Sequence, residues 1–374
     1  MKNKITEDMI ESTPGEPPSA VGYQEKQIFQ ISENTQEFID KFYPNIDIDD
    51  WNDWRWQIKM SVTNKQELKR FFFLEDYERN AFENKLKFRV TPYYLSLIIN
   101  SPELRKTVIP TTYENIYSQD ESEDPLFEDR YKISNIVHKY KNRALFLSTN
   151  FCSTVCRYFT RSRCVMSNEN HRLIENHQEN NSEWKNGIDY IRNHDEINDV
   201  IISGGDPLTC SDDRIEWLLR ELRDISHIEI IRIGTKIPTV CPQRITDRLT
   251  NILKKYHPIF INIHLTHPNE LTSEMKEACG RLSDAGCPLF SQTVLLNGVN
   301  DSIEIMKLLM SGALRMRVKP YYLYICDKIL GSGHFRTSID KGKHIIKKLR
   351  SECSGLAIPS LILDSEKEKI LMLP

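Results

Sequence analysis

The stretch from Asn150 to Cys164, NFCSTVCRYFTRSRC, combines residue types and spacings that are typical of metal chemistry. Cys152 and Cys156 are separated by three residues, so two thiolates could hold one edge of a metal cluster. Phe159 stands three residues further on, where a third cysteine would be sought. Three interpretations are open: a cluster site with a missing ligand, a site whose third ligand is displaced to Cys164, and buried thiols that bind no metal.

Other residues that could bind a ligand follow short apolar runs. Gly204, Gly205 and Asp206 form the motif SGGD after DVII. The glycines leave backbone N–H groups unobstructed and the carboxylate would suit an amino group, although such a motif can also be a plain turn. His264 follows PIFINI, where a core histidine with satisfied hydrogen bonds is the alternative.

Two carboxylates also follow apolar runs: Asp327 after YYLYIC and Asp364 after LAIPSLIL. A carboxylate at the end of a buried strand is costly unless a cation neutralises it. If the two converge, they could bind a substrate ammonium; two separate surface turns are the alternative. Lys369, in SEKEKILMLP, belongs by composition to a solvated charge run, whereas a partly buried lysine there could form a Schiff base.

These residues need a scaffold that brings the ends of several strands together. From Arg143 onward, six β-rich runs alternate with amphipathic helical patterns: RALFLST, DVIISGG, EIIRIGT, PIFINIHLT, PLFSQTVLL and RVKPYYLYI. The alternation predicts an α/β fold with a parallel sheet and helices outside it. Ligand-type residues follow nearly all six runs, which favours the rim of a partial barrel over the single switch point of an open sheet.

The composition of the chain changes along its length and predicts four parts. Residues 1–45 are polar and are expected to form a loosely ordered arm. Residues 46–142 are dense in aromatics and predict an N-terminal helical domain, residues 143–355 the barrel, and residues 356–374 a short C-terminal segment that contains Lys369.

Charge and hydropathy exclude several classes of partner. The formal net charge of -3 over 374 residues gives no basic field, so we expect no nucleic-acid partner. No apolar run approaches the roughly 20 residues that cross a membrane, and the N-terminus lacks the apolar core of a secretion signal. The 9 cysteines, an odd number, indicate free thiols or metal ligands. We therefore expect a cytoplasmic protein without a membrane partner.

Taken together, these motifs resemble the lysine 2,3-aminomutase family of radical S-adenosylmethionine (radical SAM) enzymes. The resemblance extends from about Trp51 to the C-terminus and rests on an ordered series that includes WNDWRWQ, TPYYLSL, SGGDPL, HPNELT, VLLNGVND and KPYYLYICDKILGSGHFRT. It implies a partial (β/α)6 TIM-type barrel with an N-terminal helical domain. It also implies an isomerase, an intramolecular transferase that interconverts L-lysine and β-lysine by 2,3-amino migration, with a [4Fe–4S] cluster, S-adenosylmethionine and pyridoxal phosphate.

The resemblance assigns roles to individual positions. Arg161 matches the residue that binds the substrate carboxylate, Asp327 and Asp364 match the pair that holds the substrate ammonium, and Lys369 stands in for the lysine that carries pyridoxal phosphate. The implied metal ligands are Cys152 and Cys156, with Cys164 as the candidate third. The implied cofactor-binding residues are Gly204, Gly205, Asp206, His264, Gln292, Lys139, Tyr140 and Arg143.

The chain departs from the family pattern at four places, the first of which is Lys139, where the family has an arginine. Phe159 replaces the third cysteine, DSEKEK replaces a glycine-rich turn before the cofactor lysine, and Ser302 stands where a zinc ligand would be, so we expect no zinc. The resemblance also implies an electron donor such as flavodoxin or ferredoxin, and a homo-oligomer. Two alternatives are open: a catalytically silent homologue that binds pyridoxal phosphate or lysine without a complete cluster, and a relative that acts on another amino acid or on a protein-borne lysine.

Overall fold

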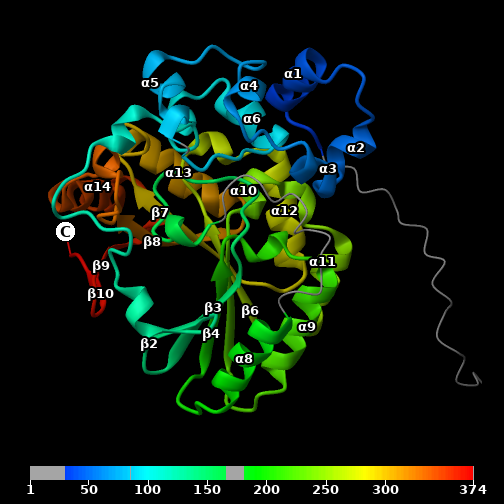
Figure 1. Ribbon diagram of the computed structural model, residues 1–374, viewed down its shortest axis with the longest axis vertical. Coiled ribbons are helices and arrows are strands. Elements are labelled where there is room, and N and C mark those ends of the chain that lie inside the picture. The colour runs from blue at the N-terminus through cyan, green and yellow to red at the C-terminus, as the bar shows by residue number, and fades with distance from the viewer. Residues whose placement is uncertain (1–29, 85, 166–180, 374) are drawn as a thin grey trace, which may run out of the picture.

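The structure is a computed structural model that describes residues 30–84, 86–165 and 181–373. Its centre is a ten-stranded sheet whose strands lie side by side in chain order (Figure 1). The strands are β1 (Lys132–Ile133), β2 (Ile136–Tyr140), β3 (Arg143–Thr149), β4 (Asp199–Gly204), β5 (Ile230–Thr235), β6 (Ile259–His264), β7 (Leu289–Leu295), β8 (Val318–Ile325), β9 (Ser360–Asp364) and β10 (Lys369–Leu371).

The sheet is parallel in its middle and antiparallel at both edges. Neighbouring strands from β3 to β9 pair in parallel, whereas β1, β2 and β3 pair antiparallel, as do β9 and β10. The sheet is of the predicted α/β type, and it forms a partial barrel, because β1 and β10 are the two edges of the described sheet and do not pair with each other. All six predicted strand runs are strands, and β9 adds a seventh parallel strand from the segment that follows.

Helices cover the outer face of this sheet, as Figure 1 shows. They are α8 (Asn181–Arg192), α9 (Asp212–Arg223), α10 (Ile237–Val240), α11 (Asp247–Lys255), α12 (Ser273–Asp284), α13 (Ile303–Arg315) and α14 (Ile339–Glu352). In α9, the side chains at Ile215, Leu218, Leu219 and Leu222 are all buried, because helical periodicity places them on the face that packs against the strands.

Side chains alternate between the two faces of each strand, and this alternation positions the site. In β5, Ile231 and Ile233 are buried in the core under the helices, whereas Arg232 and Gly234 line a cavity on the other face. A strand has a side-chain period of two, so a polar residue every second position is delivered to the barrel interior. The same alternation places Asn262 and His264 of β6, and Tyr322 and Tyr324 of β8, in that interior.

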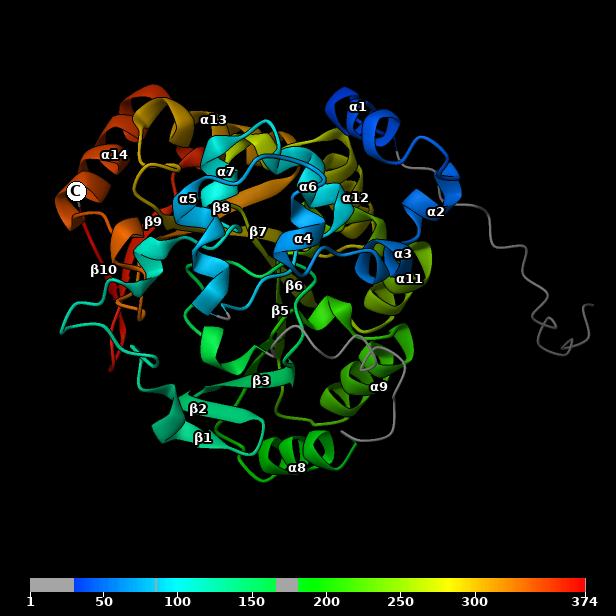
Figure 2. The same cartoon turned by 45° about the horizontal axis from the view of Figure 1, so that its top comes forward.

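A helical region precedes the barrel and packs around its own core. Figure 2 shows its helices gathered at one end of the strands. They are α1 (Glu33–Phe42), α2 (Ile48–Asn52), α3 (Trp54–Lys59), α4 (Lys65–Leu68), α5 (Asp76–Arg79), α6 (Pro92–Ile98) and α7 (Pro102–Lys106). Phe38, Trp51, Phe71 and Tyr93 belong to one buried cluster, which accounts for the aromatic density of the sequence.

Short 3-10 helices connect these elements. They are η1 (Ala81–Asn84), η2 (Thr112–Asn115), η3 (Glu128–Tyr131), η4 (Ser162–Cys164), η6 (Pro207–Thr209), η7 (Pro242–Arg244), η8 (Pro268–Glu270), η9 (Gly333–Phe335) and η10 (Gly355–Ala357). Within the described ranges, no helix combines the length and the apolar character that crossing a bilayer requires.

The structure corrects the expected arm over residues 1–45 and refines two other segments. Residues 1–29 lie outside the described ranges, but α1 forms within the arm and buries Phe38 and Ile39. Two apolar residues on one face suffice to dock a short helix, even in a polar segment. Strands β1 and β2, from the segment expected to be helical, and β9 and β10, from the C-terminal segment, join the barrel sheet. The boundaries between domains stay predictions.

A buried ion pair connects the helical region to the barrel. Lys236, directly after β5, lies 2.7 Å from Oε1 of Glu270 in η8, and the Tyr94 hydroxyl of α6 donates to the same oxygen at 2.7 Å. The Glu270 side chain is fully buried and its other oxygen accepts from the Thr266 and His267 backbone. One carboxylate therefore holds three elements together.

We predict that Glu270→Gln lowers the free energy of unfolding by about 3–5 kcal/mol, because it leaves the Lys236 ammonium buried without a counter-charge. Tyr94→Phe removes one hydrogen bond to a charged group and should cost about 1.5–3 kcal/mol. The measurement is urea unfolding. The matched control is Glu352→Gln, which breaks a solvent-exposed pair with Lys307 and should cost at most about 1 kcal/mol. Equal losses for the two Glu→Gln variants would contradict the buried role of Glu270.

Candidate functional site

Two adjoining cavities lie in the barrel, one at the carboxyl ends of its strands and one that extends into its interior. The first, about 570 Å³, is called the cysteine compartment and is lined by Cys152, Cys156, Asp206 and Lys236, among others. The second, about 240 Å³, is called the carboxylate compartment and is lined by Asp327 and Asp364, among others. Side chains or backbone of seven residues line both compartments: Phe159, Arg161, Ser203, Gly234, Asn262, His264 and Gln292. The two compartments therefore form one continuous site.

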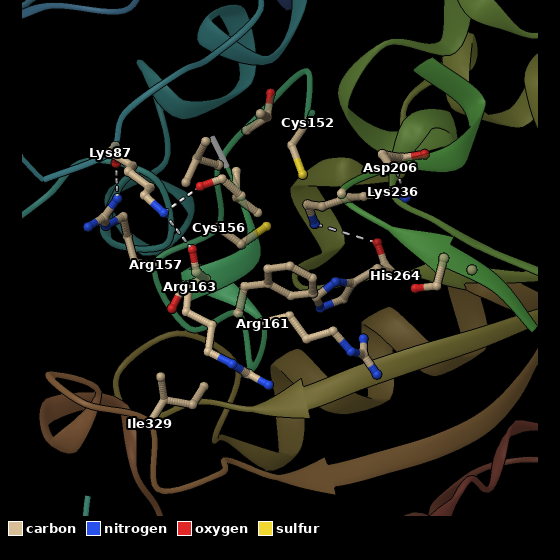
Figure 3. A pocket seen from close by; sticks show the side chains of 18 of the residues that line it. Lys87, Cys152, Cys156, Arg157, Arg161, Arg163, Asp206, Lys236, His264 and Ile329 are labelled. Carbon is tan, nitrogen blue, oxygen red and sulfur yellow. Dashed lines mark hydrogen bonds between the residues drawn. The ribbon is translucent and has the colours of Figure 1, made fainter. Parts of the chain in front are cut away.

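In the cysteine compartment, Cys152 and Cys156 follow β3 and lie in the same pocket as Asp206 and His264 (Figure 3). Burial raises the pKa of both thiols, and the pKa of Cys152 is raised further by the charge of Asp206. Both thiols are therefore protonated at neutral pH unless a cation stabilises the thiolate. The sequence predicts that Cys152, Cys156, residues 204–206 and His264 cluster at one mouth of the barrel, and the compartment contains all of them except Gly204.

The SGGD motif brings the end of β4 against the cysteine loop. Gly204 has a φ of +122°, and a Cβ on Gly204 or Gly205 would collide with the carbonyl of Thr149 or Phe151 respectively. The glycines are therefore required by the close approach of two backbones. Gly205 lines the cysteine compartment, whereas Gly204 is not among its lining residues.

The Asp206 carboxylate is held by donors from the protein itself. It accepts hydrogen bonds from the Thr235 hydroxyl and the Lys236 backbone N–H, both at 2.7 Å, and from the Leu208 backbone N–H at 3.1 Å. Burial raises the pKa of Asp206, and these hydrogen bonds oppose the rise. The carboxylate thus has a fixed orientation at the edge of the compartment.

His264, at the end of β6, stands between the two compartments. Burial and the nearby Lys236 ammonium lower the pKa of the imidazole well below its usual value, so the ring is neutral. Its Nε2 atom lies 3.3 Å from the Tyr158 hydroxyl, and the two rings meet edge to face. A neutral ring in a cavity is available as a hydrogen-bond partner for a ligand.

Cys164, the candidate for a displaced third metal ligand, lines neither compartment. It ends η4, and the Lys87 ammonium fixes that turn by donating to the carbonyls of Ser162 and Val165 (Figure 3). In the parts of the chain that the structure describes, no three His, Cys, Asp or Glu side chains are grouped closely enough to hold a metal ion. In this arrangement of the loop, Cys164 is not grouped with Cys152 and Cys156 in the cysteine compartment, and its role as a third ligand stays a prediction.

In the carboxylate compartment, Asp327 follows β8 and Asp364 ends β9. Burial raises the pKa of Asp327 to about 6; the Thr160 hydroxyl, which donates to it at 2.7 Å, opposes the rise, and the charge of Asp364 adds to it. Asp364 Oδ2 lies 3.2 Å from the Lys369 ammonium. Asp364 Oδ1 is buried and has no hydrogen-bond partner among the described residues.

Lys369 reaches this pair from β10. Its ammonium donates to the Tyr324 hydroxyl at 2.5 Å and lies 4.5 Å from the centre of the Tyr324 ring. The side chain is 27% exposed, so it is not part of a solvated charge run. Of the two alternatives for Asp327 and Asp364, the structure shows convergence in one compartment and not two separate surface turns, and Lys369 lines the same compartment.

Arg161 lines both compartments but is already paired. Its Nε and Nη2 atoms donate to the two carboxylate oxygens of the buried Glu128 at 2.7 and 2.9 Å. A guanidinium has five N–H groups, so this bidentate pair leaves Nη1 available for a further anion. Glu128, Lys236 and Tyr324 were not singled out from the sequence, because nothing local marks an acidic, basic or aromatic residue as buried in a site.

The three residues expected near pyridoxal phosphate line the carboxylate compartment together. The Lys139 ammonium donates to the backbone carbonyls of Ser365 and Leu126, and the Arg143 guanidinium lies 4.1 Å from the centre of the Tyr140 ring. The Tyr140 hydroxyl is buried and lacks a hydrogen-bond partner among the described residues. Two cations and an unpartnered hydroxyl suit an anionic group such as a phosphate.

Comparison with known proteins gives the class of this fold and site. Residues 146–309 match the Radical SAM superfamily. The chain is 43% identical to L-lysine 2,3-aminomutase of Fusobacterium nucleatum over 89% of this chain and 78% of that protein. It is 44% identical to L-lysine 2,3-aminomutase of Clostridium subterminale over 84% and 76%, and 39% identical to glutamate 2,3-aminomutase of Clostridioides difficile over 85% and 75%.

The partial barrel and its cysteine-bearing mouth thus belong to the radical SAM class. Within that class, the chain belongs to the lysine 2,3-aminomutase family and is an aminomutase-like isomerase. The family implies a [4Fe–4S] cluster and S-adenosylmethionine. The cysteine compartment falls within the size range of small-molecule sites and offers polar groups on several strands, which fits S-adenosylmethionine.

The described residues do not fit a cluster held by three cysteine thiolates. Cys152 and Cys156 supply two, Phe159 offers no lone pair at the third position of the motif, and Cys164 lies outside the compartment.

We predict that anaerobic reconstitution with iron and sulfide leaves fewer than about four irons per wild-type chain, and that Phe159→Cys increases the iron retained, because thiolate is the preferred ligand of such clusters. Iron analysis and the visible absorption of the protein provide the measurement. Cys164→Ser is the control and should change neither value. Retention of about four irons by the wild type, abolished by Cys164→Ser, would show that the loop rearranges to use Cys164.

Proposed function

We propose that the protein is a pyridoxal-phosphate-dependent 2,3-aminomutase that acts on L-lysine and forms β-lysine. The observation that supports this most strongly is the carboxylate pair Asp327 and Asp364 in a cavity that Arg161 also lines. L-lysine carries an ammonium at one end and a carboxylate at the other, so both poles have a complementary partner. Among the described residues, Asp364 Oδ1 is buried without a hydrogen-bond partner, which supports a role in binding an ammonium.

The same compartment would hold the cofactor. We assign Lys369 as the lysine that carries pyridoxal phosphate, and Lys139, Tyr140 and Arg143 as the groups that bind its phosphate. When bound, the cofactor supplies an aldehyde that joins the amino group covalently and a π-system that delocalises an unpaired electron. The protein's part is to place the amino group and to keep water out of the barrel interior.

Residues that line both compartments would connect the cofactors. We assign Gly205 and Asp206, which line the cysteine compartment only, together with His264 and Gln292, to S-adenosylmethionine and its surroundings. Gly204, which lines neither compartment, would contribute by allowing the close approach of the β4 end to the cysteine loop. His264 and Gln292 line the cysteine and the carboxylate compartments alike. A substrate bound between Arg161 and the carboxylate pair would therefore adjoin the cysteine compartment, where the family's radical chemistry begins.

The charge of the compartment favours lysine over an acidic substrate. One relative is named glutamate 2,3-aminomutase, but a glutamate side chain would bring a third carboxylate against Asp327 and Asp364. Like charges in a buried site repel strongly. The pair therefore acts as a specificity filter for a cationic side chain.

Phe159 supports a second candidate function. A homologue that lacks the third thiolate would bind pyridoxal phosphate and lysine without starting radical chemistry, and would need no electron donor. Both candidate functions use the carboxylate compartment to bind lysine. They differ in whether the bound lysine is converted to β-lysine. Formation of β-lysine by the reduced, reconstituted protein would establish the first; lysine binding without product, rescued by Phe159→Cys, would establish the second.

We predict that Asp327→Asn weakens the binding of L-lysine at least tenfold and leaves the uptake of pyridoxal phosphate unchanged, because removing one partner of a desolvated charge pair costs on the order of 2–5 kcal/mol. Absorbance titrations of the pyridoxal-loaded protein measure the affinity. The control is Asp195→Asn, at an exposed position outside both compartments, which should bind lysine normally. Equal affinities for L-lysine and L-glutamate in the wild type would contradict the assignment.

We also predict a pH dependence of lysine binding. Burial raises the pKa of Asp327 to about 6, so this carboxyl is neutral below that pH and ionised above it. The ammonium of lysine stays charged from pH 5 to 8, so affinity should increase as the pH rises through about 6 and level off above about 7. The ratio of wild-type to Asp327→Asn affinity isolates this effect from other titrations. A ratio that is constant from pH 5 to 8 would contradict it.

A further inference from the structure

We propose that the Lys369 ammonium occupies the substrate's ammonium site until the cofactor engages it, so that pyridoxal phosphate must load before free lysine binds tightly. This inference rests on the proposed function. It adds an order of binding and gives Lys369 a second role, as an internal occupant of the carboxylate pair.

The hairpin formed by β9 and β10 fixes Lys369 in this place. Lys369 and Asp364 are directly opposite one another in its antiparallel register, so their side chains share one face of the hairpin. The connecting turn is closed by the Ser365 N–H, which donates to the Glu368 carbonyl at 3.0 Å. The Lys139 ammonium also stabilises this turn, because it donates a hydrogen bond to the Ser365 carbonyl at 2.8 Å. The contact between Lys369 and Asp364 is thus built into the register.

The partners of the Lys369 ammonium are those that any alkylammonium would seek. The ammonium lies 3.2 Å from a carboxylate oxygen of Asp364 and donates to the Tyr324 hydroxyl at 2.5 Å. It also lies 4.5 Å from the centre of the Tyr324 ring and 5.5 Å from the centre of the Tyr322 ring. Carboxylate, hydroxyl and aromatic faces together form a recognition site for a primary ammonium. The side chain of free lysine ends in the same group on the same four-carbon stem as Lys369.

The charges around Asp327 and Asp364 also support the occupancy of the ammonium site by Lys369. Asp327 and Asp364 repel one another, and the Lys369 charge offsets part of that repulsion, with a smaller contribution from Arg161. While Lys369 is an ammonium, a second ammonium at the pair would meet a like charge. A Schiff base between the Lys369 amine and the aldehyde of the cofactor, formed with loss of one water, would remove the ammonium from the carboxylate pair. The pair would then be able to accept the ammonium of the substrate.

The experiment compares two variants that cannot carry the cofactor and differ in charge. Lys369→Met is neutral and Lys369→Arg stays cationic. The probe is L-lysine, titrated calorimetrically into the cofactor-free proteins. Lys369→Met should bind lysine at least tenfold more tightly than the cofactor-free wild type, whereas Lys369→Arg should bind as weakly as the wild type. Lys367→Met, at an exposed position in the same hairpin turn, is the control and should match the wild type.

The outcomes separate this inference from the proposed function. If pyridoxal-loaded wild type binds lysine but Lys369→Met gains no affinity over cofactor-free wild type, the occupancy of the site by Lys369 is overturned and the proposed function stands. If pyridoxal-loaded wild type does not bind lysine, the proposed function fails, and a gain in Lys369→Met alone would still support the occupancy. Equal gains in Lys369→Met and Lys369→Arg would show that bulk, not charge, controls access, and would also overturn the inference.

Discussion

Two carboxylates in the interior of a barrel cannot both remain charged without a cation close by. Several contacts in this site stabilise the charges of Asp327 and Asp364. Isolated buried charges are costly, and a pair of like charges more so. Thr160 donates to Asp327, and Lys369 lies against Asp364. One oxygen of Asp364 is still without a donor among the described residues. The carboxylate compartment can therefore accept one more cationic group next to Asp364. The ammonium of a lysine side chain is such a group.

The architecture of the barrel brings the residues of the site together. Parallel strands end at the same edge of a sheet, and the period of two along each strand sends every second side chain inward. The SGGD glycines allow the end of β4 to touch the cysteine loop. The buried Glu270 secures the helical region to the barrel next to Lys236, which lines the cysteine compartment. Stability and site geometry thus depend on some of the same residues.

The sequence predicts the parts of this picture that depend on local patterns. The six strand runs, their helices and the polar residues that follow each strand were readable, because periodicity and strand ends are local features. Pairings between distant residues were not. The sequence around Glu128 does not indicate that this residue pairs with Arg161. The sequence around Glu270 does not indicate that it pairs with Lys236. Likewise, the contact of Asp364 with Lys369 depends on a hairpin register, and the exclusion of Cys164 depends on the path of a turn that Lys87 fixes.

The central claim is that the carboxylate compartment recognises the ammonium of a lysine side chain. The most direct measurement is a parallel titration of the pyridoxal-loaded wild-type protein with L-lysine and L-norleucine, which has the same carbon chain without the terminal ammonium. The account predicts that lysine binds at least tenfold more tightly, because only lysine neutralises Asp327 and Asp364. Equal affinity for the two amino acids would contradict it.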